Sequence, residues 1–225
     1  MAHEHVKSVS KKKIFVLDDH PIVREGMGQL INRQPDLVFC GGAASVAEAV
    51  RSTAQLKPDM VIVDLSLPKE SGMDFIKELR SAHPRVGILV VSMYDEFIYA
   101  ERVLKAGAMG YLMKQEATDR LIGAIRTVLQ GKIYLSERMR SEIVTRTVGG
   151  GGESVSSDPI AKLSDRELEI FRYIGQKMST RQIAEKLFLS VKTVEAHREN
   201  IKHKLGLYSA ADLFEKALLW TKMEK

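Results

Sequence analysis

The chain has 225 residues, of which 44% are apolar and 28% are charged. Both fractions are typical of folded globular proteins and exclude an extensively disordered or fibrous chain. No stretch approaches about 18 apolar residues without a charge, which argues against a membrane-spanning helix, and residues 1–13 lack the apolar core of a secretory signal. The single cysteine, Cys40, cannot form an internal disulfide, which is typical of the reducing cytoplasm.

The net charge is a modest +5, from 34 basic and 29 acidic residues, but its distribution is uneven. Between Lys177 and Lys204, seven Lys and Arg residues accompany only three Glu, and His197 and His203 lie in the same stretch. A local basic stripe is typical of proteins that bind a phosphate backbone. An ordinary solvated helix face would give the same composition, so charge alone leaves both interpretations open.

Four consecutive glycines at 149–152, followed by a serine-rich stretch to Pro159, predict a flexible tether between two domains. The expected division is a disordered tail at 1–13, a first domain at 14–130, a linker helix with the tether at 131–158, and a second domain at 159–225.

The first domain alternates short apolar runs with amphipathic stretches. Strands are predicted at Ile14–Leu17, Leu37–Cys40, Met60–Val63, Gly87–Val91 and Gly110–Met113. Helices are predicted at Pro21–Arg33, Ser45–Gln55 (opened by a capping box, Ser45 to Glu48), Ser71–Ala82, Glu96–Lys105, Thr118–Gln130 and, leading to the tether, Glu137–Arg146. Five strand–helix units in series predict an α/β fold, a doubly wound parallel sheet with the flavodoxin-like strand order 2-1-3-4-5.

The second, smaller domain has only helical periodicity and is predicted to be all-α. Capping boxes open helices at Ser164 and Ser179. Helices at Thr180–Leu187 and Val191–Leu205 are separated by three residues, which predicts a helix-turn-helix motif at about 179–198. Gly206 follows where a helix end favours a left-handed residue, and a last helix is expected at Ser209–Met223.

Polar side chains follow four strands of the predicted sheet. Asp18 and Asp19 follow the first strand, Asp64 the third, Ser92 the fourth and Lys114 the fifth. Because the carboxyl ends of parallel strands share one edge, these side chains are expected to converge there. Three carboxylates repel one another unless a cation compensates them, and hard oxygen ligands favour Mg²⁺ over zinc.

This set of groups suits phosphoryl transfer to a carboxylate. Asp64 is the candidate nucleophile, Lys114 would pair with the phosphoryl group, and the metal ligands would be Asp19, Asp18 partly through water, Asp64 and the backbone carbonyl of Ser66. Taken singly, each residue has an ordinary interpretation: an aspartate in a turn, a surface lysine, or, for Ser92, the N-cap of the next helix. The combination at four strand ends makes the functional interpretation the stronger one.

The helix beginning at Val191 is the predicted recognition helix. Its apolar residues Val194, Ile201 and Leu205 should face the core. The candidate DNA contacts are Lys192, Thr193, Glu195, Ala196, His197, Arg198, Glu199 and Lys202. Glu195 and Glu199 would accept hydrogen bonds from cytosine, although pairing of Glu199 with Lys202 or His203 is the alternative.

The last helix carries Leu213, Leu218 and Trp220, more apolar surface than a small core requires. This excess favours a homodimer, because two-fold dimers read two half-sites. The alternative is that Trp220 merely covers the core of its own domain.

Several segments closely resemble a known family. "IFVLDDHPIVREGM", "PDMVIVDLSLPKESGMDFIKELR", "ILVVSMYDE" and "KAGAMGYLMK" resemble the receiver domain of bacterial response regulators. "LSDRELEIF" and "STRQIAEKLFLSVKTVEAHRENIKHKLGL" resemble the LuxR-type helix-turn-helix. Together they resemble a two-component response regulator of the NarL/FixJ subfamily, over about 14–130 and 160–222. A local departure is Gln115 after the lysine, where proline is frequent.

The resemblance implies that Asp64 is the phosphoacceptor, Asp18 and Asp19 the acidic metal pair, Lys114 the family's lysine, and Ser92 and Tyr111 the switch hydroxyl and aromatic. Without it, Tyr111 would be an ordinary strand aromatic. The expected partners are a histidine kinase and promoter DNA, with RNA polymerase a further candidate. Two other functions fit the same residues: a DNA-binding protein whose receiver is a passive scaffold, and a Mg²⁺-dependent phosphohydrolase.

Overall fold

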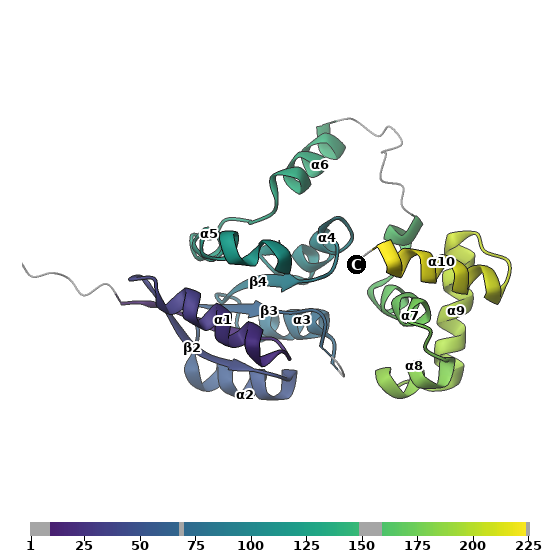
Figure 1. Ribbon diagram of the computed structural model, residues 1–225, viewed down its shortest axis with the longest axis horizontal. Coiled ribbons are helices and arrows are strands. Elements are labelled where there is room, and N and C mark those ends of the chain that lie inside the picture. Colours follow the sequence, from purple (N-terminus) through teal and green to yellow (C-terminus); the bar gives the residue numbers. More distant parts are fainter. Residues whose placement is uncertain (1–9, 68–69, 149–158, 224–225) are drawn as a thin grey trace, which may run out of the picture. The chain divides into compact units, whose positions relative to one another are not determined.

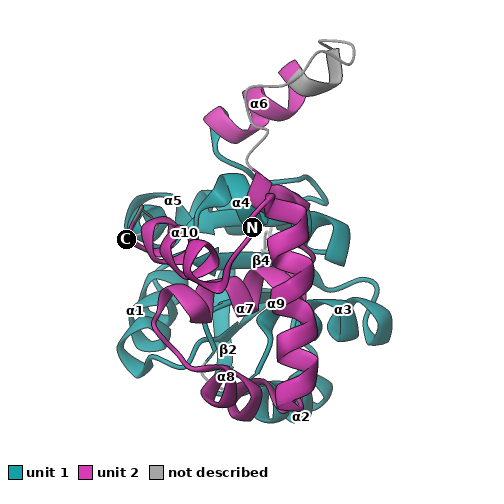
Figure 2. Ribbon diagram, turned by 90° about the vertical axis from the view of Figure 1, so that its right-hand side faces the viewer, with its two compact units in different colours: residues 1–137 teal, residues 138–225 magenta. Residues whose placement is uncertain are grey.

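The chain forms two compact units, residues 1–137 and 138–225, which Figure 2 distinguishes by colour. The computed structural model describes residues 10–67, 70–148 and 159–223. Most of the predicted tail, the tether at 149–158 and Pro68 lie outside the described residues. Among the residues that are described, no helix combines the length and the apolar character needed to cross a membrane.

The first unit contains the predicted parallel sheet, with the strand order β2-β1-β3-β4-β5. Its strands are β1 (Lys12–Leu17), β2 (Leu37–Ala43), β3 (Met60–Val63), β4 (Gly87–Ser92) and β5 (Gly110–Met113). Its helices are α1 (Pro21–Asn32), α2 (Val46–Leu56), α3 (Gly72–Ala82), α4 (Glu96–Ala106) and α5 (Ala117–Leu129). The flavodoxin-like order is therefore confirmed.

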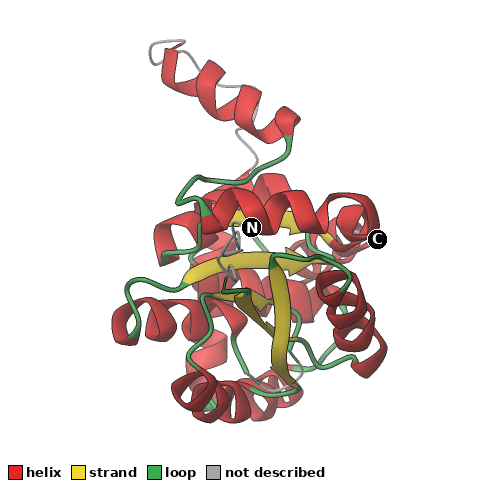
Figure 3. Cartoon of the chain, turned by 90° about the vertical axis from the view of Figure 1, so that its left-hand side faces the viewer, coloured by secondary structure: helices red, strands yellow, loops and turns green. Residues whose placement is uncertain are grey.

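Helices cover both faces of the sheet, as Figures 1 and 3 show. One core cluster joins Met27 and Ile31 of α1 and Leu121 and Ile125 of α5 to alternate strand residues such as Ile62. The intervening strand residues face the other side, since successive strand side chains alternate, and they too are buried. Burial on both faces explains why the strands are almost continuously apolar.

Three strands are longer than predicted. β4 is longer by one residue, since Ser92 is the last residue of the strand and not the first residue after it. β1 begins at Lys12, because Lys13 donates its backbone N–H to Asp59 Oδ2 at 2.8 Å and Lys12 pairs with the same carboxylate at 2.7 Å, so the expected disordered tail does not include these two residues. β2 continues through two glycines to Ala43, and its register with β1 shifts between Ile14 and Phe15. Glycine within a strand often marks such a bulge, and here it concealed the end of the strand.

The start of α2 differs from a capping box in one bond. Ser45 is the N-cap and accepts from the backbone N–H of Glu48, as expected. The Glu48 carboxylate, however, accepts from Ala44 at 3.0 Å and not from Ser45 itself. The reciprocal bond is therefore displaced by one residue toward the preceding strand.

The first unit ends later than the expected boundary at residue 130. After α5 the chain turns back, and Tyr134 forms a parallel bridge with Gly110 at the free edge of β5. The Tyr111 N–H donates to the Tyr134 carbonyl at 2.9 Å, and the Ser136 N–H donates to Glu96 Oε1 at 2.8 Å. Residues 132–136, called here the edge segment, therefore pack on the first unit. The helix α6 (Glu137–Val148) follows it.

The second unit is helical, as predicted. A 3-10 turn at Pro159–Lys162 precedes α7 (Asp165–Gly175), α8 (Thr180–Leu187), α9 (Val191–Leu205) and α10 (Ala210–Met223). Ser164 and Ser179 form complete capping boxes, and Gly206 ends α9 with a φ of 64°. The predicted helix–turn–helix spacing of α8 and α9 is confirmed.

The apolar residues of α10 correct one expectation. Leu213 is fully buried and Trp220 is only 8% exposed, because Trp220 packs on Phe171 of α7 at a ring distance of 5.4 Å and beneath Arg172. Leu218 is half-buried. The prediction that Leu213 and Trp220 form an exposed dimerisation surface is wrong, and the alternative that Trp220 covers its own core is confirmed.

Candidate functional site

Two aspartates lie side by side at the ends of neighbouring strands. Leu17 of β1 is paired with Val63 of β3, so Asp18 and Asp64 follow at the same height. The Asp64 N–H donates to the Leu17 carbonyl at 2.9 Å and continues the ladder past the last strand residue. Both aspartates are only 1% exposed.

Lys114, which follows β5, bridges the two carboxylates. Its Nζ lies 2.6 Å from Asp18 Oδ2 and 2.8 Å from Asp64 Oδ2. The ammonium group is largely buried, so these contacts are weakly screened by water. Residues far apart in the sequence thus meet at one edge of the sheet.

Burial decides how the central pair ionises. It raises the pKa of Asp64, and the attraction of Lys114 and the Ser66 hydrogen bond only partly oppose this effect. Burial alone would lower the pKa of Lys114, but Asp64 and Asp18 outweigh it and the pKa is raised. The lysine is therefore firmly charged, whereas ionised Asp64 is under-compensated and suited to a further cation.

The raised pKa of Asp64 carries a cost in stability. When the pKa of a carboxyl group is higher in the folded protein than in the unfolded chain, the folded protein becomes less stable as the pH rises. The loss begins near the pKa in the unfolded chain, about 3.9, and is complete above the pKa in the folded protein. Asp64→Asn should therefore raise the free energy of unfolding of the first unit at neutral pH, because Lys114 keeps Asp18 as its ionised partner. Calorimetry of the full chain would measure this, and the advantage should vanish below about pH 4 and narrow when Mg²⁺ is added. A Tm of Asp64→Asn below that of the wild type at neutral pH would show that ionised Asp64 does not destabilise the folded protein.

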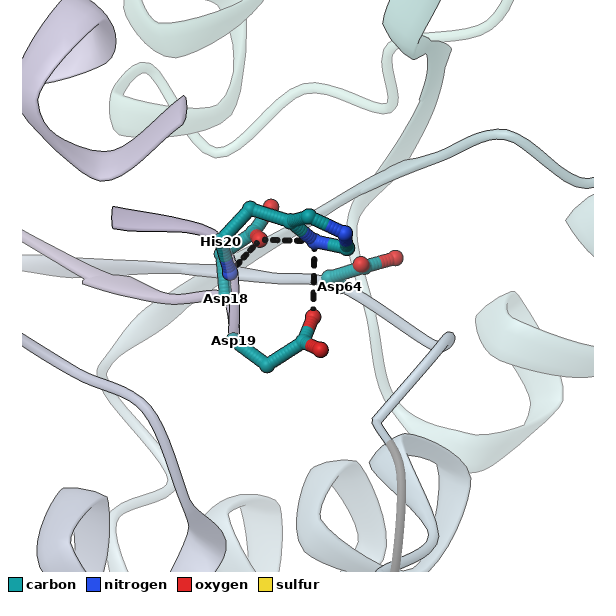
Figure 4. Close-up of side chains that lie close together, drawn as sticks. All are labelled: Asp18, Asp19, His20 and Asp64. Carbon is teal, nitrogen blue, oxygen red and sulfur yellow. Dashed lines mark hydrogen bonds and ion pairs between the residues drawn. The ribbon is translucent and has the colours of Figure 1, made fainter. Parts of the chain in front are cut away.

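Asp19 and His20 complete a cluster that can hold a metal. One ligand atom from each of Asp18, Asp19, His20 and Asp64 lies within 4.8 Å of the others, and Figure 4 shows the four side chains gathered together. Three carboxylates and one ammonium leave a formal charge of −2, which matches a divalent cation. Hard carboxylate oxygens are the ligands that Mg²⁺ prefers, so the residues fit this ion.

Sequence analysis missed His20 as part of this cluster. Its Nδ1 lies 2.8 Å from Asp19 Oδ1 and 3.2 Å from Asp18 Oδ1, as the dashed lines of Figure 4 mark. The signal was available, because His20 directly follows the two aspartates at the same strand end.

The loop after β3 is held close to Asp64. The Ser66 N–H donates to Asp64 Oδ1 at 3.0 Å, whereas the role of the Ser66 carbonyl as a metal ligand stays a prediction. Gly72, at the start of α3, lies against this loop so tightly that a Cβ atom there would be 2.5 Å from the Asp64 carbonyl oxygen. Only glycine fits at this position, because any side chain would push the loop away from the start of α3.

The two residues expected to switch are both buried. Ser92 is fully buried, and its hydroxyl accepts from the Tyr94 N–H at 3.4 Å. The N-cap of α4 is Asp95, so the alternative role of Ser92 as that cap is excluded. Tyr111 is also fully buried, and its hydroxyl donates to the Tyr94 carbonyl at 2.7 Å.

The second candidate site is the outer face of α9. Val194, Ile201 and Leu205 are buried, as predicted. Lys192, Glu195, Ala196 and Glu199 are exposed, whereas Thr193, His197, Arg198 and Lys202 are half-buried.

Some of these side chains bind to neighbouring residues of the same unit, and others do not. Glu199 pairs with Lys202 at 2.9 Å, which favours the intrahelical alternative for that residue, and the Thr193 hydroxyl contacts the N-cap Ser190. Among the described residues, the side chains of Lys192, Glu195 and Arg198 have no hydrogen-bond or ion-pair partner, which leaves their polar groups available to a nucleic acid.

Two family models match the chain. The response regulator receiver domain matches residues 14–126, and the luxR family of bacterial regulatory proteins matches residues 161–217. The chain is 41% identical over 209 residues to the oxygen regulatory protein NreC of Staphylococcus carnosus, which covers 92% of this chain and 96% of NreC.

The solved structures to which the chain is similar include two response regulators. A LuxR-family two-component response regulator from Aurantimonas sp. SI85-9A1 is 34% identical, with a TM-score of 0.57, over 62% of this chain and 99% of that one. RcsB of Salmonella enterica serovar Typhimurium, bound to promoter rprA with the phosphomimetic BeF3-, is 24% identical, with a TM-score of 0.68, over 92% and 98% of the two chains. At that identity, the second match supports the fold alone.

Proposed function

Since the chain belongs to the NarL/FixJ subfamily of response regulators, we propose that phosphorylation of Asp64 by a histidine kinase controls its binding to promoter DNA. Proteins of this subfamily join a receiver domain to a LuxR-type DNA-binding domain and regulate transcription. The observation that carries the proposal is the buried contact of Lys114 with both Asp18 and Asp64. This contact holds the positive charge of Lys114 where the oxygens of a transferred phosphoryl group would lie.

In the proposed reaction, an Asp64 carboxylate oxygen attacks the phosphorus of the kinase's phosphohistidine. The new O–P bond forms as the P–N bond breaks, and the electron pair of that bond returns to the histidine nitrogen. The Lys114 ammonium, whose Nζ now lies 2.8 Å from Asp64 Oδ2, would shift from this carboxylate to the phosphoryl oxygens.

Asp18, Asp19, Asp64 and the Ser66 carbonyl would hold Mg²⁺ during this reaction. When bound, the ion would neutralise negative charge on the phosphoryl oxygens. The donor set and the formal charge of −2 support this part of the proposal.

The switch would begin with the new charge on Asp64, which brings up to two negative charges and three acceptor oxygens. The Ser92 hydroxyl, which accepts a long 3.4 Å hydrogen bond from the Tyr94 N–H, would turn toward a phosphoryl oxygen. Tyr111 already points inward here, so phosphorylation would stabilise the buried rotamer over an exposed one.

The test uses acetyl phosphate with Mg²⁺ and the full chain. We expect intact-mass spectrometry to show one added phosphate, about 80 Da, on the wild type and none on Asp64→Asn. DNA affinity, measured before and after, should rise only for the wild type. A mass increase in both proteins would refute the assignment of Asp64.

The same experiment separates the other two functions. A passive receiver predicts that Asp64→Asn binds DNA as well as the wild type in the presence of the phosphodonor. A phosphohydrolase predicts sustained turnover of small phosphate esters, whereas the proposal expects one phosphate per chain and no enzymatic turnover.

For the DNA-binding unit, we expect Lys192 and Arg198 to contact phosphates and Glu195 to contact bases. Lys192→Ala or Arg198→Ala should weaken binding across sequences and reduce the salt dependence of log K by about one unit for each lost contact. Salt titrations by fluorescence anisotropy would measure this, with Lys222→Ala on α10 as the matched control. Unchanged slopes in both variants would place the DNA-binding surface elsewhere.

We propose homodimerisation on DNA, since two-fold dimers read two half-sites. Among the described side chains of α10, Phe214 and Leu219 are the large apolar ones that are exposed, whereas Leu213 and Trp220 are buried. RNA polymerase is a further proposed partner, and DNA binding implies a cytoplasmic location. The proposed domain boundaries are 12–136 for the receiver and 159–225 for the DNA-binding domain, joined through α6.

A further inference from the structure

We propose that His20 is itself a ligand of the divalent cation, so that the site binds Mn²⁺ through an imidazole nitrogen and discriminates between Mn²⁺ and Mg²⁺ more strongly than carboxylates alone would. The inference rests on the proposed function only in taking this acidic cluster as the cation site. It assigns a direct metal bond to the imidazole nitrogen of His20, which lies among the carboxylate oxygens of this cluster.

The spacing of the donor atoms supports a shared ion. Neighbouring ligands of an octahedral ion with bonds of about 2.0–2.2 Å lie about 2.8–3.1 Å apart. His20 Nδ1 is 2.8 Å from Asp19 Oδ1 and 3.2 Å from Asp18 Oδ1. An ion could therefore be placed beside all three atoms with little movement of the side chains.

The backbone of His20 is held in place. The His20 N–H donates to Asp18 Oδ1 at 2.9 Å, and the following Pro21 restricts His20 to the extended conformation in which it is found, with φ −86° and ψ 111°. When an ion binds, only the side-chain torsions of His20 still have to be ordered. The ring is 61% exposed, so an ion or its water ligands can reach it from solvent.

The chemistry of the donor predicts which ions benefit. Imidazole suits transition metals, whereas Mg²⁺ prefers oxygen and keeps its water. Loss of His20 should therefore weaken Mn²⁺ binding by about 10-fold and Mg²⁺ binding by much less. A histidine that merely hydrogen-bonds to the aspartates would compete with the ion, and its removal would leave Mn²⁺ binding unchanged or tighter.

The test compares untagged full-length wild type with His20→Gln and the control His83→Gln, a histidine at the C-cap of α3. Calorimetric titrations with Mn²⁺ and Mg²⁺ should show the selective loss in His20→Gln alone. Electron spin-echo spectra of the Mn²⁺ complex should show a ¹⁴N coupling that His20→Gln removes and His83→Gln retains. Absence of that coupling in the wild type, or unchanged Mn²⁺ affinity in His20→Gln, would overturn the proposal.

A third measurement keeps this proposal separate from the function of Asp64. Acetyl phosphate with Mg²⁺ should still add one phosphate to His20→Gln. Phosphorylated Asp64 without a nitrogen coupling would refute only the role of His20. A nitrogen coupling in a wild type that never accepts phosphate would refute the proposed function and leave the metal ligand standing.

Discussion

Replacing Lys114 with methionine should slow the phosphorylation of Asp64 by about 100- to 1000-fold, the usual effect of removing one fixed charge from a transition state. Methionine keeps much of the side-chain volume but removes the ammonium group that lies 2.6 Å from Asp18 and 2.8 Å from Asp64. The two buried carboxylates would then repel both each other and the incoming phosphate. Initial rates with acetyl phosphate, followed by intact mass, would measure the loss.

The matched control is Lys105→Met, because Lys105 lies on the surface of the same unit, with its side chain 81% exposed. Its phosphorylation rate should stay within about 2-fold of the wild type, since exposed ion pairs contribute little. A rate for Lys114→Met within about 3-fold of the wild type would remove the lysine from the reaction. The assignment of Asp64 would then rest on the mass-shift experiment alone.

Gly175→Ala should destabilise the DNA-binding unit by about 3 kcal/mol, the upper part of the usual range for overpacking, and more if α10 cannot shift. A Cβ atom at this position would lie 2.0 Å from Thr221 Oγ1 and 2.3 Å from the Ala217 carbonyl oxygen. The Thr221 hydroxyl already donates to that carbonyl at 2.8 Å, so α10 would have to move as a whole. DNA affinity should fall with the folded fraction.

The chain's one tryptophan, Trp220, makes this measurement specific to the unit. It packs on Phe171 of α7, so its fluorescence reports the α7–α10 contact during urea unfolding. The control Gly123→Ala, on α5, meets no atom within 4 Å and should leave this transition unchanged while stabilising the receiver by about 0.5–1 kcal/mol. An unchanged urea midpoint in Gly175→Ala would show that the two helices separate easily.

The convergence of Asp18, Asp64 and Lys114 could be predicted from sequence because a parallel sheet leaves little freedom. Each residue follows a recognisable apolar run, and all such runs end at one edge. The strand order then requires Asp18 and Asp64 to be neighbours. Periodicity and capping chemistry likewise located α8 and α9 to the residue.

Other features depend on contacts that no local pattern encodes. The inward position of Tyr111 depends on a hydrogen bond to the Tyr94 carbonyl, 17 residues away. The burial of Trp220 depends on how closely α7 approaches α10, which is set by the small size of Gly175. The edge segment is only five residues long, and its one bridge to β5 depends on where the chain lies after the end of α5.

The edge segment has a mechanical consequence for signalling. Its hydrogen bonds attach it at one end to Tyr111 of β5 and at the other to Glu96, the first residue of α4. Any displacement of α4 relative to β5 must stretch or release one of these two anchors. The chain that continues into α6 is thus attached to two elements that can move relative to each other, and not to a single rigid element. If α4 and β5 move apart and one hydrogen bond breaks, the connection that leads to the DNA-binding unit becomes longer.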